Sequence, residues 1–284
     1  MTYCDLHTHS YYSDGTFSPA ELIAAAEKRD LGAVALCDHN TVAGLPEFLE
    51  AARGSRVEAV PGVEFSTDYG DRELHILGLF IRPEDYAAVT ELLEDGKRRK
   101  EQSNIDLVDA LNRAGYRLDY GQIRGKTPGG QVNRAHIAAA LTEAGYTESV
   151  KDAFRTLLAP SRGYYTPPKR PDALETVAFI AELGSVPVLA HPFLNLKQEG
   201  ALREFLSRAK PRGLAGMETM YPLFDEEQTR LAGAIAEEFG LLPSGGSDFH
   251  GGNKPDIALG TGKGNLAVPI SCLENLKSRI TSKR

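Results

Sequence analysis

The chain has 284 residues, a formal net charge of −7 and 42% hydrophobic residues, which is an ordinary composition for a folded globular protein. The negative charge argues against a protein that holds nucleic acid by bulk electrostatics, so we expect no stable binding of duplex nucleic acid. Three widely spaced cysteines predict no disulfide framework, and no leader or membrane-spanning run is apparent, so the sequence predicts a cytoplasmic protein without a membrane partner.

Short apolar runs alternate with helical patterns along most of the chain. Strand patterns occur around 5–9 and at 34–39, 57–65, 74–81, 186–191, 214–220 and 241–250. Helical patterns occur at 18–30, 41–54, 171–184 and 224–240, and the first begins with Ser18 as a cap followed by Pro19. This alternation predicts a largely parallel α/β fold with its functional residues at the carboxyl ends of the strands.

The stretch from 85 to 169 breaks this rhythm. It contains a long charged helical pattern at 91–115, a glycine-rich loop at 125–130 and two shorter helical segments. Because strands resume after it, we interpret residues 85–169 as an inserted helical cap that selects the substrate. Residues 1–84 and 170–284 are then the two parts of one barrel domain.

The histidines are concentrated at the predicted strands. Six of the seven fall in or at the ends of strands: His7, His9, His39, His75, His191 and His250. Three carboxylates lie in or beside the same strands: Asp14, Glu64 and Asp248. His7 and His9 share a face because strand side chains repeat every two residues. Since a parallel α/β fold brings its strand ends to one mouth, these nine residues predict a metal site.

Nine ligands exceed what a single ion accepts, because zinc takes about four and manganese about six. A carboxylate such as Glu64 can bridge two ions, so we expect two or three divalent ions. Mn²⁺ is the first expectation, and Fe²⁺, Zn²⁺ or Mg²⁺ are alternatives that imidazole and carboxylate ligands also suit. Asp5 and Asp38 are expected to stand behind the ligands and to hold imidazole N–H groups.

Several short motifs, in this order, resemble those of the polymerase-and-histidinol-phosphatase (PHP) superfamily of metal-dependent phosphoesterases: DLHTHS with SDG, CDHN, PGVE, HILG, AHP and GSDFHG. The resemblance runs from Asp5 to Gly251 and implies a distorted (β/α)7 barrel with up to three divalent ions. It implies that one ion is held by His7, His9, Glu64 and Asp248, a second by Glu64, His75 and His191, and a third by Asp14, His39 and His250.

Asp14 and the inserted segment resemble the TrpH-like branch of this superfamily, which includes 3′,5′-nucleoside bisphosphate phosphatases and 5′-to-3′ exonucleases on short RNA. Histidinol phosphatases commonly have a histidine at the position of Asp14. The cap of this branch usually carries Arg-Pro-His, where this chain has Arg134, Ala135 and His136. By this resemblance five residues contact the substrate: Gln102, Ser103, Asn104, Arg134 and His136. Arg134 also follows a glycine-rich loop at an expected helix start, which favours an anion such as a second phosphate.

The predicted chemistry is hydrolysis of a phosphate monoester. Water held between two metal ions ionises near neutral pH and is the expected nucleophile, with Asp14, Glu64 and Asp248 as catalytic carboxylates. Asp14 or a water on the third ion is the candidate for protonating the leaving group. The first expectation for the substrate is a nucleoside 3′,5′-bisphosphate, with 5′-to-3′ cleavage of short 5′-phosphorylated oligonucleotides as a further activity. Two alternatives stay open: a phosphatase for histidinol phosphate or another small molecule, and a metal-binding module without turnover.

Overall fold

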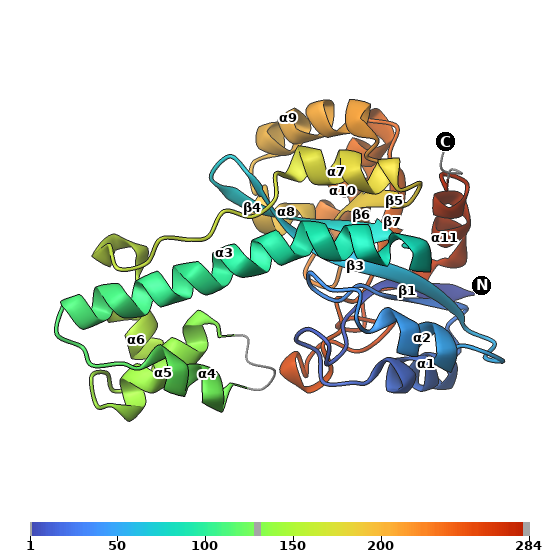
Figure 1. The fold of residues 1–284 in the computed structure, drawn as a ribbon. Coiled ribbons are helices and arrows are strands. Elements are labelled where there is room, and N and C mark those ends of the chain that lie inside the picture. The colour runs from blue at the N-terminus through green and yellow to red at the C-terminus, as the bar shows by residue number, and fades with distance from the viewer. Residues whose placement is uncertain (1, 128–131, 281–284) are drawn as a thin grey trace. The chain divides into compact units, whose positions relative to one another are not determined.

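A computed structural model describes residues 2–127 and 132–280 of the chain (Figure 1). The backbone divides into two compact units: unit 1 is Met1–Glu91 with Pro171–Arg284, and unit 2 is Leu92–Arg170. The sequence of the second unit thus lies within that of the first. The bounds 85–169 of the inserted segment and its role as a cap stay predictions. Residues 128–131, which include part of the predicted glycine-rich loop, lie outside the described residues.

Unit 1 is built on an eight-stranded sheet with the order β7-β6-β5-β4-β3-β2-β1-β8. The strands are β1 (Tyr3–Thr8), β2 (Ala33–Leu36), β3 (Glu58–Tyr69), β4 (Arg72–Leu79), β5 (Val186–Leu189), β6 (Gly216–Met220), β7 (Leu242–Gly245) and β8 (Val268–Pro269). Four pairings are parallel: β1–β2, β2–β3, β5–β6 and β6–β7. The pairings β3–β4, β4–β5 and β1–β8 are antiparallel. β8 is an edge strand of two residues that the sequence patterns did not predict.

The segment after β7 meets β1 and brings the sheet close to a closed barrel. The backbone N–H of Asp248 donates to the carbonyl of His7 at 2.8 Å, and the N–H of His9 donates to the carbonyl of Phe249 at 2.9 Å. The predicted α/β barrel is therefore confirmed, with β1–β7 corresponding to the seven strand patterns in the sequence.

The helices of unit 1 are α1 (Pro19–Lys28), α2 (Leu45–Ala51), α7 (Ala173–Glu182), α8 (Pro192–Asn195), α9 (Glu199–Ala209), α10 (Glu226–Glu238) and α11 (Ile270–Lys277). α1 begins as predicted, because Ser18 Oγ accepts the N–H of Glu21 at 3.0 Å and the Glu21 carboxylate accepts the N–H of Ser18 at 2.7 Å. α7 packs against β3, β4 and β5, and α10 packs against β6 and β7. α1 packs against β2, whose residues are all buried.

Unit 2 is helical and has its own hydrophobic core. Its helices are α3 (Tyr86–Arg113), which contains the boundary with unit 1, α4 (Tyr120–Lys126), α5 (Arg134–Glu143) and α6 (Val150–Thr156). The core includes Leu107, Leu111, Ile137 and Leu141. Across residues 2–127 and 132–280, no helix combines the length and the apolarity that a membrane crossing requires.

Candidate metal centre

The predicted ligand residues converge on one region of unit 1 because of where they stand on the strands. β1 carries His7 and ends just before His9, β3 carries Glu64, and β4 carries His75. His39, His191, Asp248 and His250 follow the ends of β2, β5 and β7, and Asp14 lies in the turn after β1. In the β3–β4 ladder Glu64 pairs with Leu77, two residues from His75, so Glu64 and His75 point to the same face.

Glu64 lies at the centre of the cluster, and its side chain is fully buried. Five imidazoles have a ring nitrogen within 3.3 Å of its carboxylate: His7, His9, His39, His75 and His191. Oε2 faces the first three rings and Oε1 faces the last two. A carboxylate that divides its oxygens between two sets of imidazoles is suited to joining two metal ions.

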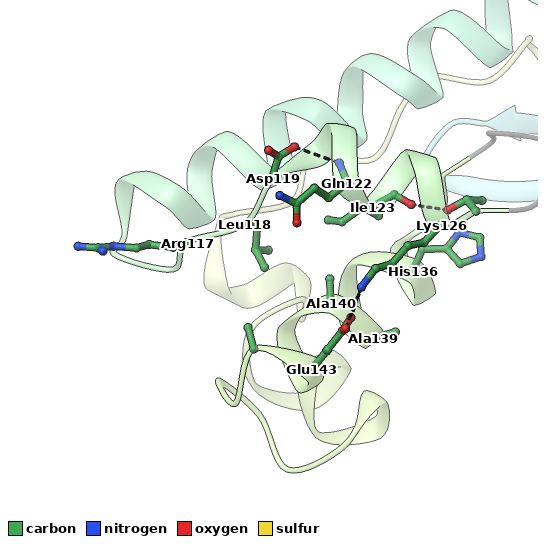
Figure 2. Close-up of a pocket in the computed structure, with 12 residues that line it drawn as sticks. Arg117, Leu118, Asp119, Gln122, Ile123, Lys126, His136, Ala139, Ala140 and Glu143 are labelled. Carbon is green, nitrogen blue, oxygen red and sulfur yellow. Dashed lines mark hydrogen bonds and ion pairs between the residues drawn. The ribbon is translucent and has the colours of Figure 1, made fainter.

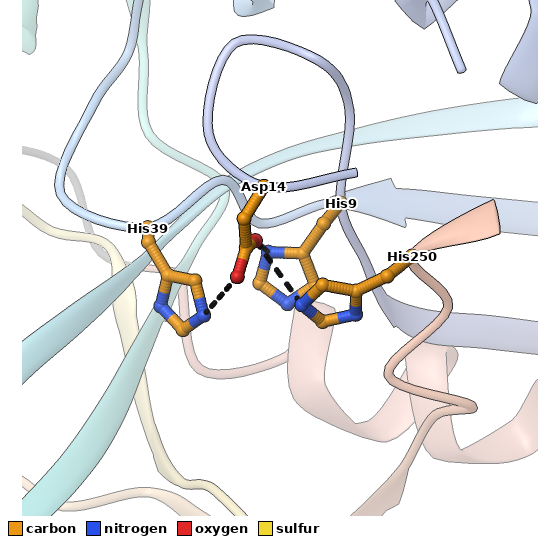
Figure 3. A group of neighbouring side chains, drawn as sticks. All are labelled: His9, Asp14, His39 and His250. Atoms are coloured by element: carbon orange, nitrogen blue, oxygen red, sulfur yellow. Dashed lines mark ion pairs between the residues drawn. The ribbon is translucent and has the colours of Figure 1, made fainter. Parts of the chain in front are cut away.

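Asp14 forms a second group with His9, His39 and His250 at the edge of the cluster (Figure 3). Asp14 Oδ1 lies 3.1 Å from Nε2 of His250, and Oδ2 lies 3.8 Å from Nε2 of His39. The Nδ1–H of His250 donates to the carbonyl of Asp248 at 2.8 Å, which leaves Nε2 to face Asp14. The Asp14 side chain is 55% exposed whereas His9 is buried, so this group opens toward solvent.

Three sets of candidate ligand atoms each lie within 4.8 Å of one another: His7, His9, Glu64 and Asp248; His9, Asp14, His39 and His250; and His39, Glu64 and His75. The first set coincides with the residues that the resemblance implies for one ion. The second adds His9 to the residues implied for the third ion. The last contains His39 where His191 was expected, although Nε2 of His191 also lies 3.0 Å from Glu64 Oε1.

Asp248 turns its two carboxylate oxygens toward different partners. Oδ1 lies 3.1 Å from Nε2 of His9. Oδ2 accepts the hydroxyl of Tyr221 and the ammonium of Lys254, both at 2.7 Å. Only one oxygen of Asp248 therefore faces the histidines. Neither Tyr221 nor Lys254 was predicted from the sequence, where no local pattern distinguishes them.

Glu218 is a further functional candidate that the sequence patterns did not identify. It is fully buried in β6, its Oε1 lies 2.9 Å from Nδ1 of His7, and its Oε2 accepts the backbone N–H of His191 at 2.6 Å. Because Glu218 engages Nδ1 of His7, the Nε2 of that ring faces Glu64 and Asp248. The available signal was a single carboxylate within the apolar run LAGMETM, since buried carboxylates are rare unless paired.

The expectation that Asp5 holds an imidazole N–H is wrong. Asp5 accepts the backbone N–H and the hydroxyl of Ser247 at 2.8 and 2.5 Å, and the N–H of Gly260 at 2.7 Å. These donors lie on loops, and Ser247 immediately precedes Asp248. Asp5 thus anchors the loop that carries a candidate ligand, and Glu218 contacts the ring of His7 instead.

The same expectation is wrong for Asp38. Its carboxylate accepts the N–H and the hydroxyl of Ser10 at 2.8 and 2.6 Å, and the hydroxyl of Ser13 at 2.6 Å. Ser10 and Ser13 lie in the loop between His9 and Asp14. Asp38 therefore fixes this loop through hydroxyl and backbone donors, which match a buried carboxylate as well as an imidazole does.

Unusual backbone conformations occur at three residues of these strand ends. Asn40, His191 and Asp248 have φ angles of 52°, 26° and 54°, in the left-handed region that L-residues rarely adopt. His191 and Asp248 are candidate ligands themselves, and Asn40 follows His39. Hydrogen bonds such as that from Asn40 N–H to the carbonyl of Glu64 at 3.0 Å hold these conformations. Local strain of this kind is typical of functional sites.

The charged groups of the cluster shift one another's pKa values. Burial lowers the pKa of His9, but the carboxylates of Asp248 and Glu64 outweigh it and raise this pKa to about 9. Burial opposes protonation of His75 too, yet Glu64 raises its pKa to about 10. Burial raises the pKa of Glu64, whereas His7 and the other imidazoles hold it well below its usual range. A metal ion must therefore displace protons from these imidazoles.

Asp14 is poorly suited to donating a proton. Burial raises the pKa of its carboxyl group, but the hydrogen bond from His250 and the charge of His39 outweigh this and lower the pKa to about 2. A carboxyl group with this pKa is ionised at neutral pH. This low pKa therefore favours Asp14 as a metal ligand and disfavours it as the acid that protonates the leaving group.

Buried polar atoms in the cluster test whether metal ions fit there. Six atoms have no hydrogen-bond partner among the described residues: His7 Nε2, both ring nitrogens of His9, His39 Nδ1, Glu64 Oε2 and His191 Nδ1. Buried polar atoms are normally paired, because desolvation without a partner is unfavourable. Divalent cations accept such lone pairs, and a donor set of only nitrogen and oxygen matches them. The residues present fit divalent metal ions.

Arg134 begins α5 in unit 2, directly after its cap Asn133. Its guanidinium carbon lies 4.4 Å from the ring centre of Tyr165 and 5.7 Å from that of Phe154. Its guanidinium group forms no hydrogen bond or ion pair with another residue of 2–127 and 132–280. The aromatic rings position the cation, and its N–H groups are available to an anion.

The three candidates on α3 have different surroundings. Ser103 and Asn104 are buried and donate to the carbonyls of Thr166 and Val132, at 2.5 and 2.9 Å. Gln102 is exposed. Because Ser103 and Asn104 already satisfy backbone carbonyls within unit 2, their contacts favour a packing role. A substrate role for these three residues stays a prediction.

His136 lines a cavity of about 350 Å³ within unit 2 (Figure 2). Its Nδ1 accepts the backbone N–H of Asn133 at 3.1 Å, as part of the cap of α5. The wall of the cavity also contains Lys126 and Glu143, whose charged groups pair at 2.8 Å. The Nδ1 atom of His136 is thus committed to the helix cap, and only Nε2 remains for a ligand.

Comparisons with known proteins place this cluster in context. The PHP domain family matches residues 5–164. A 5′-3′ exoribonuclease of Haemophilus influenzae is 32% identical over 246 residues, covering 87% of this chain and 89% of that protein. A 3′,5′-nucleoside bisphosphate phosphatase of Chromobacterium violaceum is 29% identical over 252 residues, covering 88% of each. A crystal structure from Bifidobacterium adolescentis, assigned as a metal-dependent phosphoesterase, superimposes with a TM-score of 0.77 at 27% identity, covering 99% of this chain and 97% of that one.

A nearly closed α/β barrel with histidines and carboxylates gathered at its strand ends defines a class of metal-dependent phosphoesterases. The relatives are hydrolases of phosphoester bonds, and this chain is one as well. The chain belongs to the PHP family. The resemblance seen in the sequence motifs is thereby confirmed, together with the reaction class that it implies.

Proposed function

We propose that this chain removes the 3′-phosphate of nucleoside 3′,5′-bisphosphates and also releases 5′-nucleotides from short 5′-phosphorylated oligonucleotides. The observation that carries the proposal is the buried cluster around Glu64, where six nitrogen and oxygen atoms without a hydrogen-bond partner among the described residues fit divalent ions beside an open face at Asp14. The nucleotide substrate is supported by the relatives named exoribonuclease and nucleoside bisphosphate phosphatase.

We propose that the cluster holds two or three divalent ions, with Mn²⁺ as the first expectation. One ion would bind His7, His9, Glu64 and Asp248, another Glu64, His75 and His191, and the third Asp14, His39 and His250. Such ions, when bound, supply Lewis acidity toward a phosphoryl oxygen and neutralise charge that develops on the phosphate. Glu64 would contribute to two of these sites, and Tyr221 and Lys254 hold one oxygen of Asp248 away from the histidines.

In this proposal Arg134 binds the second phosphate of the substrate. Its guanidinium is oriented by Tyr165 and forms no ion pair with a carboxylate of residues 2–127 and 132–280. A planar fork of N–H groups matches two phosphate oxygens, which an ammonium group cannot reproduce. His136, two residues along the same helix, is a further candidate for contact through Nε2.

Substitution of Arg134 tests this assignment. Arg134→Ala should lower kcat/KM for adenosine 3′,5′-bisphosphate by about 10- to 100-fold, because one or two charge-assisted hydrogen bonds are lost. Hydrolysis of p-nitrophenyl phosphate, which has one phosphate, should change by less than about 3-fold. Arg134→Lys retains the charge without the fork and should be intermediate. Equal losses on both substrates would contradict the assignment.

Two alternative functions are separated by a substrate panel with the Mn²⁺-loaded protein. Phosphate release is compared for adenosine 3′,5′-bisphosphate, a 5′-phosphorylated trinucleotide, AMP, histidinol phosphate and p-nitrophenyl phosphate. Preference for the bisphosphate or the trinucleotide supports the proposal. Preference for histidinol phosphate supports a small-molecule phosphatase, and bound metal without hydrolysis of any compound supports a binding module.

A further inference from the structure

Two neighbouring tyrosines are exposed in the loop that joins His9 to Asp14. Tyr11 is 51% exposed and Tyr12 is 40% exposed, and their ring centres lie 4.8 Å apart with planes inclined by 31°. Large aromatic side chains are normally more buried, because burial of their apolar surface is favourable. An adjacent pair left exposed between two candidate metal ligands is therefore a feature that the fold alone does not require.

Both rings are held in place by contacts at their edges. The hydroxyls of Tyr11 and Tyr12 donate to the same oxygen, Oε2 of Glu47 in α2, at 3.0 and 3.3 Å. The ring of Tyr12 lies against Gly44, where an added Cβ would come within 2.9 Å of its Cδ2. The aromatic faces are thus fixed before any ligand arrives, so stacking on them carries a small entropic cost.

The loop itself is anchored beside the candidate metal centre. The N–H of Tyr11 donates to the carbonyl of Phe17 at 2.9 Å, and the carbonyl of Ser10 accepts the N–H groups of Ser13 and Gly15 at 3.1 and 2.9 Å. These bonds close a tight turn that ends at Asp14, the residue whose Oδ1 lies 3.1 Å from His250. Figure 3 shows the chain leaving His9 and returning at Asp14. The loop that carries the tyrosines therefore starts and ends at residues of the cluster.

The chemistry of this surface favours a planar uncharged group over a phosphate. Tyrosine faces stack on any nucleobase, which each present a π-face. The carboxylate of Glu47 at the hydroxyl edge repels phosphate, so the surface does not suit a nucleic-acid backbone. A nucleobase joined through its sugar to a phosphate at the metal centre satisfies both conditions.

We propose that Tyr11 and Tyr12 form a stacking platform for the base of the substrate nucleotide. This inference rests on the proposed function and specifies its substrate class further: the enzyme should distinguish a nucleotide from the same sugar phosphate without a base. It should do so with little preference among bases, because the platform offers ring faces and no donor or acceptor pattern for base edges.

The test compares two substrates of the Mn²⁺-loaded full chain. One is adenosine 3′,5′-bisphosphate, and the other is the corresponding anhydroribitol bisphosphate, which carries both phosphates but no base. The ratio of their kcat/KM values is the base preference. We expect a preference of about 5- to 150-fold in the natural protein, corresponding to about 1–3 kcal/mol of stacking.

Substitutions of Tyr11 and Tyr12 test whether their rings cause this base preference. Tyr11→Leu/Tyr12→Leu should reduce the preference to below about 2-fold, whereas Tyr11→Phe/Tyr12→Phe keeps the ring faces and should retain most of it. Tyr3→Leu is the matched control, because Tyr3 is 38% exposed at the start of β1, away from the strand ends of the cluster. It should keep the full preference.

The outcomes separate this inference from the proposed function. Equal hydrolysis of the two bisphosphates by the natural protein, or an undiminished preference in Tyr11→Leu/Tyr12→Leu, would overturn the platform alone. Hydrolysis of p-nitrophenyl phosphate with neither bisphosphate accepted would overturn the proposed function and the platform with it.

Discussion

Glu218 lies outside the expected ligand set but contacts two of its members. Its carboxylate contacts Nδ1 of His7 at 2.9 Å and the backbone of His191 at 2.6 Å. Glu218→Gln keeps the size of the side chain but removes its charge, so the ring of His7 is held less firmly. We expect the affinity for Mn²⁺ to fall by about 10- to 100-fold, measured by titration of the metal-free protein.

The control for this experiment is Glu226→Gln, which changes an exposed carboxylate at the start of α10 and should leave the affinity unchanged. If Glu218→Gln binds Mn²⁺ as tightly as the natural protein, then Glu218 does not support the site through His7.

The residues of the site differ in how far the sequence reveals them. His7 and His9 could be predicted because a two-residue period and strand ends are local features. Tyr221 could not, because its contact with Asp248 exists only once β6 and β7 are in register. Lys254 could not, because the loop after β7 carries no pattern that marks this lysine as the partner of Asp248. Asp38 was predicted as important but with the wrong partner, since nothing local distinguishes a serine donor from an imidazole.

At the scale of elements, strand and helix patterns predicted most of the barrel. Ser18 and Asp225 cap α1 and α10, where side-chain chemistry marks a helix start. β8 was missed because two residues carry no periodicity, and its pairing with β1 is made by residues far apart in the chain. The antiparallel placement of β4 was likewise invisible, because apolar alternation does not encode strand direction.

The close approach of β1 to the segment after β7 depends on Gly246. A Cβ added at Gly246 would lie 2.4 Å from both the backbone nitrogen and the Cβ of His7, and a strand backbone cannot yield that far. Gly246→Ala should therefore lower the free energy of unfolding by at least about 2–3 kcal/mol, measured by urea denaturation.

For Gly233→Ala in α10 we expect the opposite change in the free energy of unfolding. A Cβ at Gly233 meets nothing within 4 Å, so this variant should raise the stability by about 0.5–1 kcal/mol through the higher helix propensity of alanine. If Gly246→Ala were as well tolerated as Gly233→Ala, the described approach of β1 and β7 would be incorrect.

At the scale of the whole molecule, the cluster should link metal binding to pH and stability. The carboxylates raise the pKa values of His9 and His75 from 6.5 to about 9 and about 10. Protonation of these rings therefore stabilises the metal-free protein fully below about pH 6.5, and this contribution is lost as the pH rises through 9 to 10. Metal ions require unprotonated rings and bind better over the same rise.

We therefore expect the increase in Tm caused by Mn²⁺ to become larger as the pH rises from about 6.5 to about 8.5. Thermal unfolding of the metal-free and Mn²⁺-loaded protein at several pH values measures this increase. Mg²⁺, which prefers oxygen ligands, should give a smaller increase at every pH. An increase that stays constant or shrinks with rising pH would show that these imidazoles are not the groups that the ions occupy.

The central claim is that this PHP chain hydrolyses nucleotide phosphates with divalent ions held around Glu64. The most direct measurement titrates the metal-free protein with Mn²⁺ and follows bound metal and phosphate release from adenosine 3′,5′-bisphosphate in the same samples. We predict negligible release without metal, a rise as two or three ions bind, and its loss in Glu64→Gln. Metal-independent release, or a fully loaded protein that leaves the bisphosphate intact, would contradict it.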